Sequence, residues 1–319
     1  MIIEPMDMPA TQTHSAAALP AGGVAPLAHL GVIRARGEQA GAFLQGLLTQ
    51  EMEQLPVGQG RLAALCSAKG RVLASFVACR QAPDEFLLVC SEDLLTETLR
   101  QLARFVLRSK VRLDEATADF KLRGLLGWAA SQAQPGAARN GAVAPLTVPL
   151  APADAVQRAL WLAPLDAVEP VGAALAGSDW AFGEVRSGVA TVAAATAGQF
   201  VPQMLNDESV GGVSFRKGCY PGQEVVARSQ FRGAVKRRAF VAQVAGPAQA
   251  GDEVFAVEPA GTPCGLIVQA APAPDGGTAV IAVLGLSAVE SGQALTLGAD
   301  TGAGAPLRAP RLPYPLLDI

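Results

Sequence analysis

The chain has 319 residues, of which 50% are apolar, 17% charged and 5% aromatic. This length and composition predict about two or three folded domains and exclude a wholly disordered chain. The formal net charge is −3, and the chain has two histidines and five cysteines, with no Cys-x-x-Cys pair. Such residue counts argue against an imidazole-based or metal-binding centre and against a disulfide framework.

The first 26 residues contain Glu4 and Asp7 but no lysine or arginine. A signal peptide needs a positively charged start and a mitochondrial presequence needs arginines, so this segment indicates a flexible tail. No run of about 18 uncharged apolar residues indicates a membrane span. We therefore expect a cytoplasmic protein without membrane contact.

Residues 27–120 predict an α+β unit. The expected elements are a strand at 27–36, a helix at 38–54, a hairpin of 61–67 and 71–79, a strand at 84–90 and an amphipathic helix at 92–107, after which residues 109–113 lead into another strand. Gly70 suits the turn of the hairpin, where the backbone needs a positive φ. This order favours an antiparallel sheet covered by helices.

The second half of the chain is less regular. Residues 130–158 predict surface loop and weak strands, 178–190 a helix that ends at Gly188, and 221–231 a short helix with Pro221 near its start. Beyond a boundary near residue 235, short apolar segments recur about every ten residues and favour a small β-barrel or sandwich. These segments are 239–245, 253–257, 264–270, 278–286 and 293–297.

The segment from 214 to 240, here called the basic island, has seven basic residues and one acidic residue, and so carries +6 in a chain of net −3. A basic region in an acidic protein often has an anionic partner. A solvated helix face is the other interpretation, because basic side chains are favoured near a helix C-terminus. Charge alone leaves both interpretations open.

Cys219 lies within this island, two residues after Lys217 and just before the predicted helix at 221–231. An ammonium group and a helix N-terminus both favour a thiolate, and Gly218 and Gly222 allow the backbone to approach a ligand closely. A buried structural cysteine is the alternative, although the flanking residues favour a functional thiol. A cysteine protease would need a histidine partner, and only His29, in a predicted strand, is available.

The segment 199–238 contains the motif Lys217-Gly218-Cys219-Tyr220-Pro221-Gly222-Gln223-Glu224, which resembles the signature of the YgfZ family. Members of this family are T-protein-like, folate-binding proteins linked to iron–sulfur enzyme maintenance and to tRNA modification. The segments Phe43–Thr49, Ala68–Arg71 and Ser109–Val111 extend the resemblance over about residues 27–315.

The resemblance implies an α+β fold in which three domains form a T-protein-like ring around a central folate site. Residues 1–26 are then a flexible tail. Residues 27–234 are a GcvT-like folate-binding region of two intertwined α+β subdomains, one of them formed by 57–120. Residues 235–319 are a C-terminal β-barrel.

The resemblance and the side-chain types together give the candidate site residues. Cys219 and Lys217 are the candidate catalytic residues, and no tightly bound metal is expected. The candidate residues for binding tetrahydrofolate or another folate are Trp180, Arg186, Tyr220, Gln223, Glu224 and Arg228. A second folate-associated tryptophan of the family aligns with Leu30.

Three functions follow. The first is a folate-binding accessory protein for iron–sulfur client enzymes, including tRNA-modifying enzymes. The second is a folate-dependent aminomethyl or methyl transferase or demethylase. T-proteins have acidic residues after the hairpin glycine that help to move a proton at the folate's reactive nitrogen, and the stretch from Gly70 to Phe76 has none. Glu184 or Glu224 could take over this role. The third is weak tRNA contact through 216–238, which should depend steeply on salt.

Overall fold

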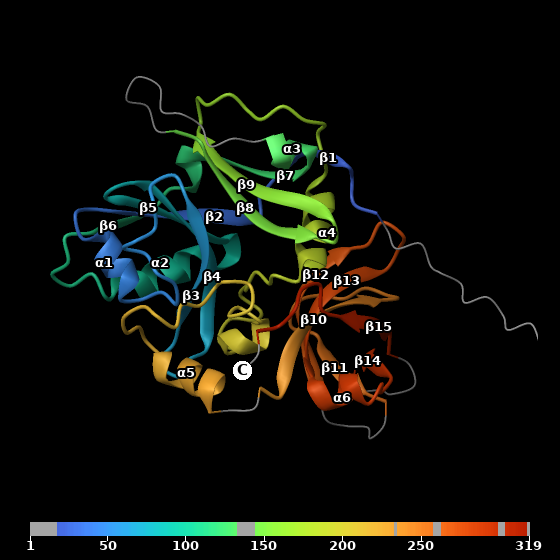
Figure 1. The fold of residues 1–319 in the computed structure, drawn as a ribbon. Helices are drawn as coiled ribbons and strands as arrows, with labels where there is room; N and C mark the ends of the chain where they lie inside the picture. Colours follow the sequence, from blue (N-terminus) through green and yellow to red (C-terminus); the bar gives the residue numbers. More distant parts are fainter. Residues whose placement is uncertain (1–17, 133–143, 233–234, 258–262, 299–303, 318–319) are drawn as a thin grey trace, which may run out of the picture.

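A computed structural model describes residues 18–132, 144–232, 235–257, 263–298 and 304–317. Two antiparallel sheets and a closed six-stranded barrel are arranged around a common centre (Figure 1). The expected fold class is therefore confirmed, with mixed α/β units in the first part of the chain and a β-barrel at its end. The part of the expected tail that covers residues 1–17 lies outside the described residues.

The four-stranded sheet has the order β1-β7-β9-β8. Its strands are β1 (Gly22–Pro26), β7 (Phe120–Gly127), β8 (Leu146–Ala153) and β9 (Val156–Pro164), and α3 (Trp128–Gln132) follows β7. Residues 22–26, expected in the tail, pair with β7, because the alternating burial of β1 gives this edge strand an apolar face. β8 and β9 replace the weak strands expected in 130–158, of which residues 133–143 lie outside the described residues.

The five-stranded sheet has the order β3-β4-β5-β2-β6. Its strands are β2 (Leu30–Arg36), β3 (Gly60–Cys66), β4 (Val72–Ala82), β5 (Glu85–Ser91) and β6 (Arg112–Glu115). The hairpin of β3 and β4 turns at Gly70, whose φ is +68°, as predicted. This unit extends beyond the expected 57–120, because β2 pairs with both β5 and β6.

The helix expected at 38–54 is much shorter. α1 covers Ala40–Gln45 and ends at Gly46. The prediction was wrong because the carbonyl groups at the end of this short helix have a hydrogen-bond donor from a distant segment. The buried Lys217 ammonium donates to the carbonyl oxygens of Gln45 and Leu48. Leu47 and Leu48 are buried in the turn after α1. They are therefore core residues that continue the helical spacing of apolar side chains without being part of the helix.

Other helix bounds also differ from the predicted ones. The helix expected at 92–107 consists of a 3₁₀ turn, η1 (Glu92–Leu94), and α2 (Leu95–Ala103). α4 (Gly177–Ser187) ends at Gly188 with a φ of 71°, as predicted. α5 (Gln223–Phe231) begins after Gly222, whose φ is 81°, so Pro221 lies outside the helix. Short 3₁₀ turns are η2 (Thr117–Asp119) and η3 (Pro202–Leu205).

The barrel has the order β10-β13-β12-β11-β14-β15. Its elements are β10 (Arg237–Val244), β11 (Glu253–Ala256), β12 (Pro263–Pro272), β13 (Thr278–Gly285), α6 (Leu286–Glu290), β14 (Leu295–Leu297) and β15 (Pro306–Arg311). The sequence did not predict β15, because its prolines and arginines hide the alternation that marks a strand.

The hydrophobic cores join the three units. One core combines Leu160 of β9 and Trp180 of α4 with Val89 of β5, and another combines Phe182 of α4 with Ile281 of β13. α4 therefore packs against the four-stranded sheet and the barrel at once. Among the described helices, none is long and apolar enough to span a bilayer.

Candidate functional site

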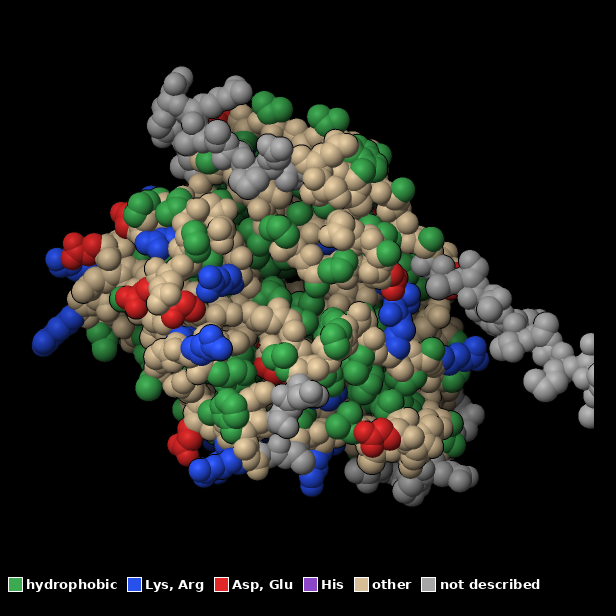
Figure 2. All heavy atoms as spheres, in the orientation of Figure 1, with side chains coloured by type: hydrophobic (Ala, Val, Ile, Leu, Met, Phe, Trp, Pro, Cys, Tyr) green, Lys and Arg blue, Asp and Glu red, His purple; other side chains and the backbone are tan. Residues whose placement is uncertain are grey.

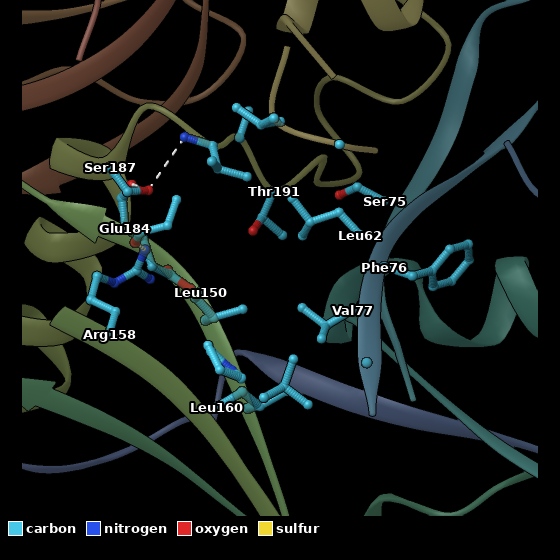
Figure 3. Close-up of a pocket in the computed structure, with 18 of the residues that line it drawn as sticks. Leu62, Ser75, Phe76, Val77, Leu150, Arg158, Leu160, Glu184, Ser187 and Thr191 are labelled. Carbon is cyan, nitrogen blue, oxygen red and sulfur yellow. Dashed lines mark hydrogen bonds between the residues drawn. The ribbon is translucent and has the colours of Figure 1, made fainter. Parts of the chain in front are cut away.

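A cavity of about 490 Å³ lies where the three units meet. One wall is formed by Leu62, Ser75 and Val77 of β3 and β4, and the facing wall by Leu150, Arg158 and Leu160 of β8 and β9 (Figure 3). Because side chains alternate along a strand, the ring of Phe76 points away from the cavity (Figure 3). Figure 2 shows the molecule hollowed near its centre, with hydrophobic side chains in the hollow and basic side chains on both sides of it.

Trp180 lines the cavity from α4 and is only 1% exposed. Its ring packs directly on β7 at Gly124, where an added Cβ would lie 2.3 Å from the indole. The Arg158 guanidinium lies 4.4 Å from the ring centroid, a cation–π contact. The indole Nε1 has no hydrogen-bond partner of good geometry among the described residues, although it lies near enough to Glu184 to lower the pKa of that carboxyl.

Glu184, one turn further along α4, is a buried carboxyl that lines the cavity. Its Oε2 lies 3.1 Å from His29 Nε2 and accepts a hydrogen bond of 3.2 Å from Gln269 Nε2. Burial opposes its ionisation, but His29, Arg158 and Trp180 together outweigh burial and hold the pKa of Glu184 below its usual value. The site therefore presents a carboxylate fixed by groups from two other units.

The partners of Glu184 have altered acidity too. Burial lowers the pKa of His29, but the hydrogen bond and charge of Glu184 more than compensate and raise it. Burial lowers the pKa of Arg158 to about 10, so its guanidinium remains charged at neutral pH. The Nε of Arg158 is buried without a hydrogen-bond partner among the described groups.

Arg186, a predicted folate residue, does not itself line the cavity. Its Nε and Nη2 donate to Asp154, at 2.9 and 3.0 Å, and Arg311 Nη2 lies 2.5 Å from the same carboxylate. Asp154 does line the cavity. Burial opposes the ionisation of Asp154, but the two arginines dominate and lower its pKa.

The other predicted residues lie apart from this cavity. Lys217 is buried, with its Nζ 2.6 Å from Leu48 O and 5.0 Å from the centroid of the Tyr220 ring. Burial lowers the pKa of Lys217 to about 8, while Glu51, Cys219 and Glu53 oppose this shift. Its ammonium therefore serves the end of α1 and does not stand free beside Cys219.

Cys219 itself is exposed. Tyr220 is buried against Val226, whereas Glu224 and Arg228 form an exposed i,i+4 ion pair of 3.0 Å on α5. Cys219, Tyr220, Gln223, Glu224 and Arg228 are all outside the cavity lining. Of the eight predicted site residues, only Trp180 lines the cavity; the functional roles given to the motif residues stay predictions.

The structure divides the basic island. Lys217 is buried at the end of α1, and the Arg238 guanidinium forms a buried ion pair with Glu208. The remaining five basic side chains are exposed: Arg216, Arg228, Arg232, Lys236 and Arg237. Phe231, next to Arg232, is 69% exposed and meets Phe215 edge-on at 5.4 Å. The exposed side chains fit the solvated-face interpretation, with Arg228 in the last turn of α5, and an anionic partner for them stays a prediction; neither interpretation had placed Lys217 and Arg238 in the interior.

The sequence reasoning missed several residues that line the cavity or contact its Glu184 carboxylate. His29, Arg158, Asp154, Gln269 and Tyr314 come from separate segments, and only tertiary contacts bring them together. His29 was the one member with a signal, since it is the only histidine outside the first 26 residues.

Comparison with known proteins defines the class. The GCVT N-terminal domain family matches residues 6–134. The glycine cleavage system aminomethyltransferase T from Bartonella henselae shares the fold, with a TM-score of 0.61 and 17% sequence identity. The structural match covers 93% of this chain and 86% of that chain. The chain thus has a T-protein-like fold. Within this class it belongs to the YgfZ family: the tRNA-modifying protein YgfZ of Vibrio vulnificus (strain CMCP6) is 30% identical over 228 residues, 69% of each chain.

A second relative is the tRNA-modifying protein YgfZ of Klebsiella pneumoniae (strain 342), which is 33% identical over 217 residues. The match covers 63% of this chain and 65% of that relative. The chain therefore spans slightly less than two thirds of the length of the Klebsiella protein.

Proposed function

We propose that this protein is a cytoplasmic, tetrahydrofolate-binding accessory protein that supports iron–sulfur enzymes, including those that modify tRNA. The observation that carries this proposal is the central cavity, which combines a flat indole wall, aliphatic walls and a fixed carboxylate. Its volume of about 490 Å³ is within the range of about 300–1,000 Å³ that is usual for small-molecule sites.

The residues of the cavity suit a pterin ring. The half-buried side chains of Leu62, Val77 and Leu150 offer apolar surface on which an aromatic ring packs well, and Trp180, 1% exposed, borders the same cavity. The Glu184 carboxylate can accept hydrogen bonds from the amino and ring N–H groups of a pterin. Arg158 Nε is a buried donor without a hydrogen-bond partner among the described groups, and a ligand oxygen would satisfy such a donor, whose burial is otherwise costly.

Binding is better supported than group transfer. On the wall formed by β4, Ser75 Oγ accepts a hydrogen bond of 2.9 Å from Val192 N, and no acidic side chain of this strand lines the cavity. The two acidic residues in the lining are Asp154, which two arginines hold, and Glu184.

A folate-dependent one-carbon transferase or demethylase is the second candidate, and Glu184 is the observation that favours it. This carboxylate lines the cavity and contacts His29, whose side chain is 42% exposed, so a proton could pass between ligand and solvent. Glu224, the other candidate acid, is 85% exposed on α5. Methylene-tetrahydrofolate formed from an aminomethyl donor with release of ammonia, or methyl-tetrahydrofolate formed from a methyl donor, by the wild type but not by Glu184→Gln would support this candidate; no product across a broad donor panel would refute it.

The surface around α5 is the proposed contact for partners. The exposed Cys219 thiol would face an iron–sulfur client enzyme, and the five exposed basic side chains of the island would contact tRNA weakly. These roles are separate from the cavity, so ligand binding and partner contact should be separable by mutation.

Calorimetry with tetrahydrofolate tests the proposal. We expect Trp180→Ala to weaken binding by about tenfold through lost ring contact, whereas Cys219→Ala should leave affinity unchanged. Trp128→Ala is the matched control, because Trp128 is 41% exposed on α3. No binding by the wild type, or equal loss in both tryptophan variants, would overturn the proposal.

A further inference from the structure

The segment between α2 and β6, residues 104–111, is here called the α2–β6 loop, and it exposes two large apolar side chains. Leu107 is 88% exposed and Phe105 is 46% exposed. One open hollow on the surface is lined by these two residues and by Gln39, Arg108 and Ser109. Figure 1 shows α2 and β6 on the side of the molecule away from the barrel. The lining of the hollow shares no residue with that of the central cavity, so the two are separate sites.

Leu107 has a backbone conformation that favours other residue types. Its φ of 36° lies in the left-handed region, which glycine and asparagine adopt readily and which is costly for a side chain such as leucine. Because the side chain is exposed, burial within this protein does not compensate for that cost. Strained backbone conformations cluster where a side chain is presented to a ligand or a partner. Strain and exposure together indicate that this leucine serves contact with another molecule.

The rest of the α2–β6 loop is fixed in place. Val106, between the two exposed apolar residues, packs against the hydrophobic core of the five-stranded sheet. Ser109 N donates to Val106 O at 2.7 Å, and Lys110 N donates to Gln39 Oε1 at 2.7 Å. The exposed side chains are therefore presented by a preformed turn, and a partner would bind it with little loss of backbone freedom.

The α2–β6 loop and its flanks are strongly basic. From 100 to 112 the chain has five basic residues and no acidic residue. Arg100 and Lys110 form ion pairs with glutamates of the same unit. Arg108 and Arg112 are exposed, and among the described residues no ion pair or side-chain hydrogen bond of either is found. The apolar side chains thus lie in a positive surface that an acidic partner would complement.

We propose that the α2–β6 loop is a docking site for an acidic segment of a partner protein, which places an apolar side chain in the hollow beside Leu107 and a carboxylate on Arg108. Arginine suits such a partner because its guanidinium binds a carboxylate through two parallel N–H groups. Phenylalanine and arginine are also enriched in protein interfaces. The proposal goes beyond the folate function and does not depend on it, because no residue of the loop lines the central cavity.

Two other anionic partners fit the α2–β6 loop less well. A flat bilayer would leave the hollow unfilled, and the loop has no tryptophan or tyrosine, the residues that are enriched at a membrane surface. An RNA strand would contact the arginines through its phosphates, but leucine offers no aromatic face on which a base stacks. An acidic protein segment uses both the charge and the apolar side chains.

Selection from a displayed library of short random peptides tests the proposal. The full-length wild type is the bait, and the double variant Leu107→Asn with Arg108→Glu serves for counter-selection. We expect enrichment of peptides that combine aspartate or glutamate with an aromatic or aliphatic residue. In fluorescence anisotropy, the most enriched peptide should bind each single variant about tenfold more weakly than the wild type, and more weakly at high salt. Leu165→Asn is the matched control and should bind as the wild type does, because Leu165 is 56% exposed after the end of β9.

Three results would overturn the proposal. Asparagine tolerates a left-handed backbone, so Leu107→Asn should keep or raise the melting temperature; a lower melting temperature would show that the leucine serves the fold. A selection that enriches no peptide over the double variant, or only peptides without carboxylates, would exclude an acidic docking segment. Phosphatidylserine vesicles and bulk tRNA are the remaining probes, and binding of either that Leu107→Asn abolishes and Leu165→Asn preserves would assign the loop to a membrane or to RNA instead. None of these results bears on the folate function, which calorimetry with tetrahydrofolate tests separately.

Discussion

Gly222→Ala should destabilise the fold strongly, because this glycine is where two segments of the family signature meet. Its φ is +81°, and an added Cβ would lie 2.3 Å from Ser67 O and 2.7 Å from the Gly70 Cα. The sequence suggested that Gly222 lets the backbone approach a ligand. The structure shows instead that it lets the turn before α5 approach the hairpin turn of β3 and β4.

The magnitude follows from these two features. A left-handed backbone costs an alanine about 1–2 kcal/mol. The clash is with backbone atoms, which cannot rotate away, and overpacking of this kind costs about 1–3 kcal/mol. The expected loss in the free energy of unfolding is therefore about 2–5 kcal/mol.

Urea unfolding followed by circular dichroism measures this loss, with Gly218→Ala as the control. Gly218 lies in the same motif, is exposed and has no heavy atom within 4 Å of an added Cβ. Both variants reduce the freedom of the unfolded chain equally, so their difference isolates the folded-state cost. Gly218→Ala should stay within about 0.5 kcal/mol of the wild type. Equal stabilities of the two variants would refute the reasoning.

Three further predictions concern other parts of the molecule. Burial, aided by Glu208, raises the pKa of Asp207 from 3.8 to about 8. Because the folded state then retains a proton that the unfolded chain releases, the free energy of unfolding should fall as the pH rises from 4 to 8. Asp207→Asn should flatten this dependence in thermal unfolding and be more stable than the wild type at pH 8. Cys219→Ala should keep its melting temperature, since the side chain is exposed, but fail to complement a deletion strain; full complementation would contradict the role of the thiol. Any tRNA affinity should fall steeply with salt and drop in Arg228→Glu with Arg232→Glu; a flat salt response would exclude phosphate contact.

Local rules predicted much of the fold. Gly70 and Gly188 have the positive φ that the hairpin turn and the end of α4 need, and such positions favour glycine whatever surrounds them. Five of the six barrel strands follow from short apolar segments between turn residues. The signature around Cys219 indicates the family, because a contiguous motif of this length rarely arises by chance.

The helix at 38–54 shows why local rules fail elsewhere. Leu47 and Leu48 continue the helical spacing, yet α1 stops at Gln45 because Lys217, 172 residues away from Gln45, takes its carbonyl. The same bond gives the Lys217 ammonium a hydrogen-bond partner other than Cys219. A charged side chain can serve a thiol, a helix end or a ligand, and its sequence neighbours do not decide among them.

The sequence by itself thus determined the family, the class of fold and most strands and turns, because these depend on neighbours within a few residues. Tertiary structure decided the site. His29, Asp154, Glu184 and Arg311 gain their roles only when separate units enclose one cavity. The physical reason is that burial and pairing set the charge and orientation of a side chain, and both depend on groups distant in sequence.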